Sequence, residues 1–180
     1  MNNILIRTID FLMAFFGLLA TFPILLIVII IGYFDTRSPV FIQERVGKNK
    51  RPFKLIKFRT MSVDTKSVAS HLASTASITK LGAFLRKTKI DELPQLWNVL
   101  KGEMSFVGPR PALFNQDDLI ALRTENRVER VLPGLTGWAQ VNGRDELPIS
   151  KKVALDNEYV TRQSLKFDIY ILWLTFVKVI

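Results

Sequence analysis

The stretch FLMAFFGLLATFPILLIVIIIGYF, residues 11–34, decides the architecture of this chain. It holds 24 consecutive residues without a charged side chain, and about 20 apolar residues suffice for a helix to cross the hydrocarbon core of a bilayer. A secretory signal peptide would have an apolar region about half as long and a small-residue cleavage site after it. The stretch therefore predicts a helix that is embedded in a membrane.

Pro23 stands near the middle of this stretch. Proline removes a backbone hydrogen-bond donor and its ring clashes with the preceding turn, so a kink or a break is expected there. Either one kinked helix spans the membrane, or two arms turn back and both ends stay on one side. Each arm reaches about 17 Å, roughly half the hydrocarbon thickness. On these grounds alone the simple span is favoured, because transmembrane helices tolerate proline.

The distribution of positive charge on the two sides of the apolar stretch predicts how the chain is oriented in the membrane. Residues 44–60 hold seven Lys and Arg residues and one Glu, whereas Arg7 and the amino terminus are the only positive charges before the apolar stretch. Positive charge stays on the cytoplasmic side. We therefore expect a membrane-embedded segment, residues 1–34, and a cytoplasmic, membrane-associated domain, residues 35–180.

The amino-acid composition limits the kinds of catalytic and metal site that the chain can form. The chain has 180 residues, a net charge of +9, no cysteine and one histidine, His71. Disulfides and thiolate metal sites are excluded, so catalysis would have to use carboxylates, hydroxyls and basic groups. The positive charge favours polyanionic partners such as phosphorylated substrates, lipid headgroups or nucleic acid.

The region after Phe34 is typical of a small, helix-rich α+β domain. SPVFIQERVG and PFKLIKFRTM predict a short hairpin that turns at Gly47 to Pro52. Residues 105–113 indicate a rigid turn, and residues 133–148 a loop. The carboxyl-terminal stretch, rich in aromatic residues, predicts either an interfacial helix or a buried one. The spacing of apolar residues predicts further helices within residues 78–90, 91–104, 119–132 and 150–160.

The tetrapeptide Asp-Glu-Leu-Pro occurs at residues 91–94 and again at residues 145–148. Acidic residues at a helix start need no function, because the helix dipole stabilises them. Near the first copy, however, six cations come from separate segments, and if half of them converge they form a phosphate pocket. Carboxylates in such a pocket would hold Mg²⁺ or attack phosphorus. The six cations are Lys57, Arg59, Arg86, Lys87, Lys89 and Arg110.

The second copy, Asp145 and Glu146, follows VNGR in a Gly-rich loop. A helix cap or a solvated loop explains it. We therefore interpret the pair as one site and one coincidence.

Three ordered motifs resemble the bacterial sugar transferases. They are KFRTM at 57–61, IDELPQLWNVLKGEMSFVGPRP at 90–111 and LPGLTGWAQVNGR at 132–144. These small monotopic phosphoglycosyl transferases move a sugar-1-phosphate from a UDP-sugar to polyprenyl phosphate, in bacteria undecaprenyl phosphate, and release UMP. The resemblance implies that residues 35–180 form a catalytic domain on the cytoplasmic face of the bacterial inner membrane.

The resemblance also implies roles for single residues. Asp91 would take the phospho-sugar covalently and would hold Mg²⁺ against the diphosphate, and Glu92 would assist it. Asp156 and Tyr159 match the family pattern, with a structural role. The substrate-binding candidates are Lys57, Arg59, Arg86, Arg110 and, more weakly, Arg144.

The family's hydrophobic segment is re-entrant, which reverses the preference for a simple span. It is broken at a Ser-Pro pair, where this chain has Phe22-Pro23. The Thr21 hydroxyl could replace the serine by bonding a carbonyl in the preceding turn. The expected fold is thus an α-rich α+β chain with a re-entrant membrane helix broken at Pro23, a catalytic domain with a short β-hairpin, and interfacial amphipathic helices.

Two other functions stay open at this point. One is a non-enzymatic, membrane-anchored basic module that binds anionic lipid or nucleic acid, and the other is a phosphatase or nucleotidase. The expected partners are a UDP-sugar, polyprenyl phosphate and membrane lipids, without nucleic acid, and a homo-oligomer stays open. The sequence names neither the sugar nor the glycan.

Overall fold

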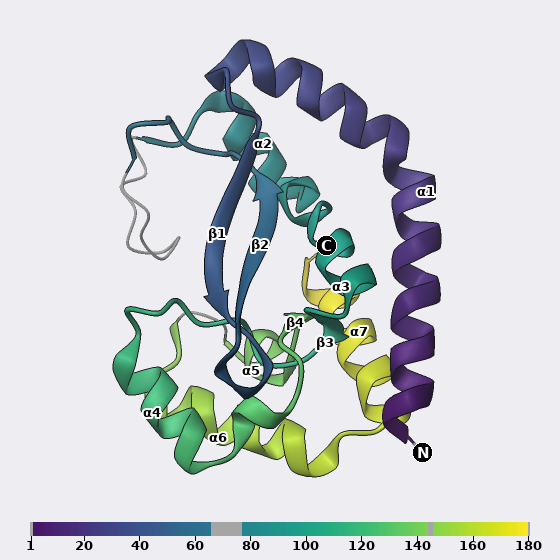
Figure 1. Ribbon diagram of the computed structural model, residues 1–180, viewed down its shortest axis with the longest axis vertical. Helices are drawn as coiled ribbons and strands as arrows, with labels where there is room; N and C mark the ends of the chain where they lie inside the picture. The colour runs from purple at the N-terminus through teal and green to yellow at the C-terminus, as the bar shows by residue number, and fades with distance from the viewer. Residues whose placement is uncertain (1, 66–76, 144–145, 180) are drawn as a thin grey trace.

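The structure is a computed structural model that describes residues 2–65, 77–143 and 146–179. A long bent helix runs along one side of a small domain built from two pairs of strands and several short helices (Figure 1). The helices are α1 (Asn2–Thr36), α2 (Lys80–Thr88), α3 (Gln95–Lys101), α4 (Asp117–Glu125), α5 (Trp138–Val141), α6 (Ile149–Arg162) and α7 (Leu165–Val179). The strands are β1 (Val40–Val46), β2 (Pro52–Phe58), β3 (Ser105–Val107) and β4 (Gly134–Thr136), and the 3₁₀ turns are η1 (Lys48–Lys50), η3 (Ile90–Glu92) and η4 (Val128–Arg130).

The α1 helix is bent but not interrupted. It stays helical from Asn2 to Thr36 with Pro23 inside it, and Figure 1 shows its second arm turning over the top of the domain. The expected break is therefore a bend, because proline removes only one hydrogen bond of the ladder. The Thr21 hydroxyl donates to the carbonyl of Gly17 at 2.6 Å, as the sequence predicted. By length and composition α1 could cross a membrane.

The predicted hairpin is present. β1 and β2 pair antiparallel, with Val40 opposite Phe58 and Val46 opposite Pro52. The side chains of Phe53 and Leu55 pack with Ala14 of α1 and Val99 of α3 in one core cluster. In Figure 1 the α3 helix lies between β2 and the first arm of α1, so one core joins the hairpin, α3 and the long helix.

The α3 helix is fixed to the outer edge of β2 by one buried amide. The Asn98 side chain donates to the carbonyl of Lys54 at 2.8 Å and accepts from the backbone N–H of Ile56 at 3.1 Å. Gly102 ends the helix with a φ of 83°, and Pro94 stands one residue before its first turn. The segment that carries Asp91 is therefore anchored on the carboxyl-terminal side of the acidic pair.

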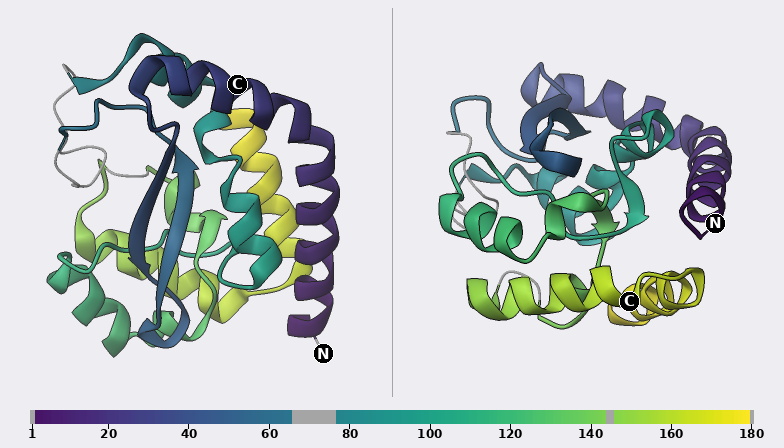
Figure 2. Two further views of the ribbon diagram at one scale, coloured as in Figure 1. Left: turned by 45° about the horizontal axis from the view of Figure 1, so that its top comes forward. Right: turned by 60° about the horizontal axis from the view of Figure 1, so that its bottom comes forward.

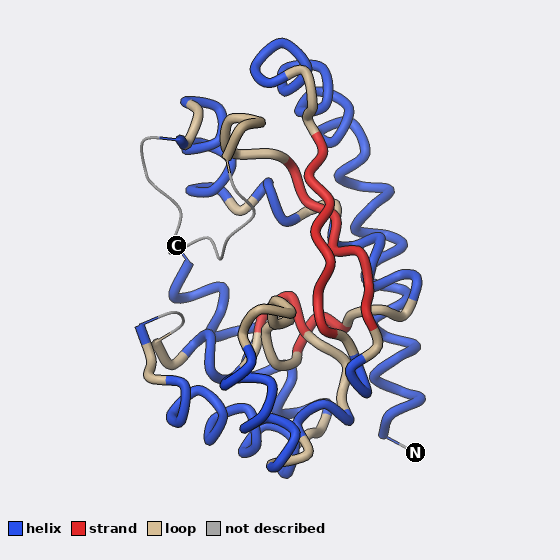
Figure 3. Tube along the Cα trace, turned by 60° about the vertical axis from the view of Figure 1, so that its left-hand side comes forward, coloured by secondary structure: helices blue, strands red, loops and turns tan. Residues whose placement is uncertain are grey.

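A second pair of strands was not predicted. β3 and β4 pair in parallel, Ser105 with Gly134 and Val107 with Thr136, and they appear as short strand segments near the foot of the hairpin in Figure 3. A Cβ at Gly134 would lie 2.1 Å from the backbone nitrogen of Gly108, so this close approach requires glycine. This strand pair joins two segments for which the sequence predicted a turn (residues 105–113) and a loop (residues 133–148).

Each of the two interpretations of the carboxyl-terminal stretch, a buried helix or an interfacial one, fits one face of α7. Phe167 and Ile171 are buried in the core with Val107 and Tyr159, whereas Trp173 and Phe176 are 58% and 67% exposed. The helix therefore has one core face and one exposed aromatic face. In the left view of Figure 2 it overlaps the first arm of α1, while in the right view the two helices stand apart.

Candidate active site

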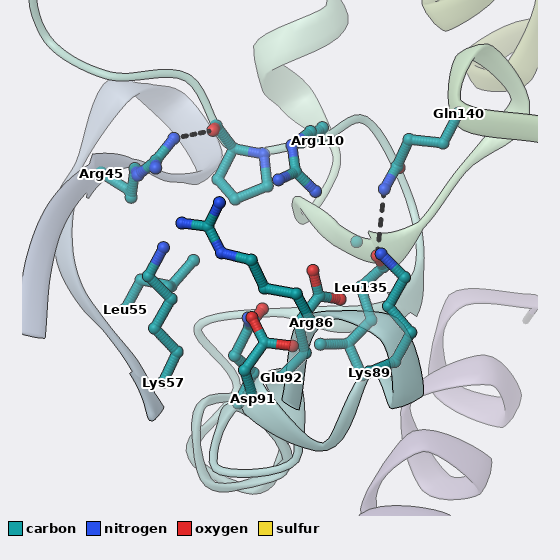
Figure 4. A pocket seen from close by; sticks show the side chains of 13 residues that line it. Arg45, Leu55, Lys57, Arg86, Lys89, Asp91, Glu92, Arg110, Leu135 and Gln140 are labelled. Atoms are coloured by element: carbon teal, nitrogen blue, oxygen red, sulfur yellow. Dashed lines mark hydrogen bonds between the residues drawn. The ribbon is translucent and has the colours of Figure 1, made fainter. Parts of the chain in front are cut away.

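A pocket of about 260 Å³ lies between the hairpin, the η3 turn and the loops around β3 and β4. Figure 4 shows guanidinium groups gathered on one side of it and two carboxylates facing them. Its wall holds five cationic side chains and two carboxylates from segments far apart in the sequence. The cations are Arg45, Lys57, Arg86, Lys89 and Arg110, and the carboxylates are Asp91 and Glu92.

The local backbone directs the acidic pair into the pocket. The α2 helix ends at Thr88, and Lys89 adopts a left-handed conformation with a φ of 60°. The chain then makes the η3 turn, which carries Asp91 and Glu92. Asp91 is only 8% exposed, and its Oδ1 atom is buried with no hydrogen-bond partner among the described residues. A buried carboxylate oxygen without a donor is costly unless a ligand or a reaction uses it.

Four of the six cations singled out in the sequence line this pocket: Lys57, Arg86, Lys89 and Arg110. The Nε of Arg86 donates to the Thr60 hydroxyl at 2.9 Å, which fixes the stem of that side chain. The expected convergence of basic groups is therefore present. Because an arginine fork matches phosphate oxygens, the wall suits a phosphate or diphosphate group.

Arg59 lies elsewhere, although it was expected in the pocket. Its Nε donates to the Ser38 carbonyl at 2.8 Å, and its guanidinium lies 5.3 Å from the centre of the Phe41 ring. Alternate side chains of a strand face the same side, and Leu55 and Lys57 of β2 both face the pocket. The strand ends at Phe58, so this alternation does not extend to residue 59. Arg144 and Asp145 lie outside the described residues.

Arg45 and Gln140 line the pocket and were missed in the sequence. Arg45 is buried, and its Nη1 donates to the Pro111 carbonyl at 3.0 Å. A signal existed, because Gln43 and Arg45 alternate with exposed residues on one face of a strand and an arginine on a buried face is unusual. Gln140 donates to the Leu135 carbonyl at 3.0 Å, and its buried Oε1 lacks a donor among the described residues.

Burial shifts the pKa of two opposed groups toward neutrality. Desolvation, followed by the negative charge of Glu92, raises the pKa of Asp91 to about 6. The positive charges of Lys57 and other nearby cations oppose this rise. Desolvation, followed by the positive charge of Arg45, lowers the pKa of Lys57 to about 8, although the negative charge of Asp91 opposes this change. Such shifts in one pocket are typical of reactive sites.

The acidic pair could hold one divalent cation only with help from a substrate. The described residues contain no group of three or more His, Asp or Glu side chains arranged as a metal site. Mg²⁺, however, commonly takes one or two carboxylates together with substrate phosphate oxygens. The unpartnered Oδ1 of Asp91 fits that arrangement.

Asp156 and Tyr159 support the site from behind. Arg123 donates to Oδ2 of Asp156 at 2.6 Å and to the carbonyl of Arg110 at 2.8 Å. The Tyr159 hydroxyl lies 3.0 Å from the Val107 carbonyl and 2.9 Å from Oδ1 of Asp168. Neither residue lines the pocket, which agrees with the structural role expected for them.

Comparison with known proteins gives the family. The model of the family described as "Bacterial sugar transferase" matches residues 1–180. The "Uncharacterized sugar transferase EpsL" of Bacillus subtilis (strain 168) is 45% identical, and the match covers 98% of this chain and 88% of that protein.

Longer relatives also match. The "UDP-glucose:undecaprenyl-phosphate glucose-1-phosphate transferase" of Escherichia coli (strain K12) is 40% identical over 98% of this chain. The "UDP-galactose-lipid carrier transferase" of Erwinia amylovora is 37% identical over 97% of this chain. The match spans 40% of the length of each of these two relatives. With a family match along its full length, the chain belongs to the bacterial sugar transferase family.

Proposed function

We propose that this chain transfers a sugar-1-phosphate from a UDP-sugar to a polyprenyl phosphate, with undecaprenyl phosphate as the acceptor, through a covalent intermediate on Asp91. The observation that carries the proposal is the buried carboxylate of Asp91, whose Oδ1 has no hydrogen-bond partner in the described part of the chain, inside a wall of five cations. The relatives named for transfer onto undecaprenyl phosphate support the same reaction class.

The reaction has two balanced steps. In the first, a carboxylate oxygen of Asp91 attacks the phosphorus that bears the sugar, and the bond from that phosphorus to the UMP oxygen breaks. In the second, a phosphate oxygen of the polyprenyl phosphate attacks the same phosphorus, and the acyl-phosphate bond breaks to restore the carboxylate. With a pKa of about 6, Asp91 is mostly ionised at neutral pH and more basic than an ordinary carboxylate.

The cationic wall provides charge stabilisation for both steps. Arg45, Arg86 and Arg110 come from three segments and face the acidic pair (Figure 4). Preorganised cations stabilise charge that develops on a transferring phosphoryl group without reorganising. Glu92 keeps the basicity of Asp91 high through its charge. Mg²⁺, when bound at Asp91, would neutralise part of the diphosphate charge.

Membrane association brings the lipid acceptor to the pocket. The exposed apolar side chains of α1 and the aromatic face of α7 suit contact with lipid, because Trp and Tyr favour the headgroup zone. We propose that α1 is re-entrant in the bacterial inner membrane and that the catalytic domain faces the cytoplasm. The alternative of a non-enzymatic basic module leaves the buried carboxylate in the pocket without a role.

The test is intact-protein mass spectrometry. The purified protein is incubated with Mg²⁺ and a panel of UDP-glucose, UDP-galactose and UDP-acetamido sugars, without a lipid acceptor. We expect a mass increase equal to one sugar phosphate with an accepted donor, and no increase in Asp91→Asn, because an amide cannot form the acyl phosphate. Adding undecaprenyl phosphate should then remove the adduct.

The second Asp-Glu-Leu-Pro copy provides a matched control. Asp145→Asn makes the same chemical change in the same tetrapeptide, and we expect it to form the adduct as the unaltered protein does. Membrane retention of Asp91→Asn checks its fold. An adduct that persists in Asp91→Asn would exclude Asp91 as the nucleophile, and its loss in Asp145→Asn would show that the wrong copy was chosen.

A further inference from the structure

A second cavity, of about 590 Å³, lies beside the amino-terminal arm of α1. It opens between that arm, the η1 turn, the η4 turn and the end of α6, and it shares no lining residue with the active-site pocket. Figure 1 shows the start of α1 next to the connection between α6 and α7. The cavity is thus a distinct feature of the molecule at the foot of the membrane helix.

The wall of this cavity is both cationic and apolar. Arg7, Lys48 and Arg130 line it from three separate elements, and the apolar side chains of Ile4 and Phe11 lie on the α1 side. Ile4 is 76% exposed and Phe11 is 48% exposed, so the apolar side continues onto the outer face of α1. Such a wall fits a molecule with an anionic head and a hydrocarbon tail.

Two polar groups in the wall show how its charge is distributed. Arg7 donates through Nη2 to the Leu100 carbonyl at 2.9 Å, while its buried Nη1 has no hydrogen-bond partner among the described residues. Asp10 also lines the cavity, but its carboxylate accepts from the backbone N–H of Phe106 at 3.2 Å. Three cations therefore face one carboxylate that is already hydrogen-bonded, and the cavity keeps an excess of positive charge.

We propose that this cavity binds the phosphate of a membrane lipid, with the hydrocarbon chains of the lipid along the exposed apolar face of α1. A phosphate would pair with Lys48 and Arg130 and would supply an acceptor beside Arg7. The lipid is a bulk anionic phospholipid of the membrane, and its phosphate lies apart from the carboxylate of Asp91. The site does not depend on the proposed transfer reaction, because no residue is shared with the active-site pocket.

The test uses two exposed cations, so that folding is preserved. The double variant Lys48→Gln/Arg130→Gln removes charge from the cavity. The control Arg51→Gln/Arg127→Gln removes the same charge next to the same two turns, from exposed residues that do not line the cavity. Native mass spectrometry of each full-length protein in a neutral detergent measures binding of phosphatidylglycerol and, separately, of undecaprenyl phosphate.

We expect the cavity variant to bind phosphatidylglycerol roughly thirtyfold more weakly, from about one kcal/mol for each cation, and the control to bind as the unaltered protein does. A selective loss seen only with undecaprenyl phosphate would assign the cavity to the acceptor of the transfer reaction and would overturn the phospholipid proposal. Equal losses in both variants, or no loss with either lipid, would overturn the proposal. The covalent adduct on Asp91 forms without lipid, so failure here is separate from failure of the proposed reaction.

Discussion

Asp91 and Lys57 lie in one pocket, and burial moves their pKa values toward each other, to about 6 and about 8. The nucleophile must be ionised to attack, so activity should rise as the pH increases through about 6. Lys57 must be protonated to attract phosphate, so activity should fall above about 8. A plot of kcat/KM against pH should therefore be bell-shaped.

The alkaline limb can be assigned with one substitution. In Lys57→Arg the cation stays charged at every accessible pH, so the fall above about 8 should disappear while the acid limb stays in place. The measurement is UMP release at low donor concentration across pH 5–10 in both proteins. An unchanged alkaline limb would mean that another group titrates there, and a moved acid limb would mean that Lys57 sets the basicity of Asp91.

Gln140 carries a buried hydrogen-bond acceptor in the wall of the pocket. Its Nε2 is held by the Leu135 carbonyl, and its Oε1 has no donor among the described residues. We expect Gln140→Leu to raise KM for the UDP-sugar by roughly tenfold, the cost of about one hydrogen bond to a bound ligand, with little change in kcat. Asn142→Ala, which removes an exposed amide two residues later in the chain, is the control. A fall in kcat with KM unchanged would contradict a binding role.

At the residue scale, the sequence predicted most of the charged residues that line the pocket, but not the whole of its wall. Asp91, Glu92, Lys57, Arg86 and Arg110 could be chosen because acidic and basic groups of complementary chemistry stand in ordered motifs. The pocket position of Gln140 depends on how the short helix α5 is placed after β4, which local spacing does not reveal. Arg59 was misplaced for a local reason, because one residue past the end of a strand the alternation no longer applies.

At the element scale, long periodic segments were predictable and short non-local ones were not. The hairpin follows from β-rich runs around a Gly-to-Pro turn, and Gly102 marks the end of α3. The parallel pair β3–β4 consists of three-residue strands separated by 26 residues, and neither strand is long enough to show a period. Its stability depends on tertiary contacts such as the approach of Gly134 to Gly108.

The Tyr159 hydroxyl links α6 to β3 and α7, since it bonds the Val107 carbonyl and Asp168. Tyr159→Phe would leave both buried acceptors without this donor. We expect the free energy of unfolding to fall by about 1–3 kcal/mol, or about 2–12 °C in Tm. Thermal unfolding in detergent measures it, with the exposed Tyr170→Phe as control. Equal Tm values for the two variants would exclude the proposed link between α6, β3 and α7.

At the scale of the whole molecule, the bend in α1 decides how the chain meets the membrane. The helix packs on α3 and the hairpin, with Ala14 and Val28 buried against the domain. A straight span would carry one arm away from these contacts. The proposed re-entrant arrangement keeps both arms on the domain and the pocket near the lipid headgroups.

Because the chain has no cysteine, one engineered thiol reports the side of the membrane on which each end of α1 lies. If α1 is re-entrant, a cysteine at position 2 should resist an impermeant maleimide in intact spheroplasts and react after lysis. Asp35→Cys is the control, because it is cytoplasmic under either topology and should react only after lysis. Labelling of position 2 in intact spheroplasts, with Asp35→Cys protected, would establish a spanning helix and place the first residues outside the cell.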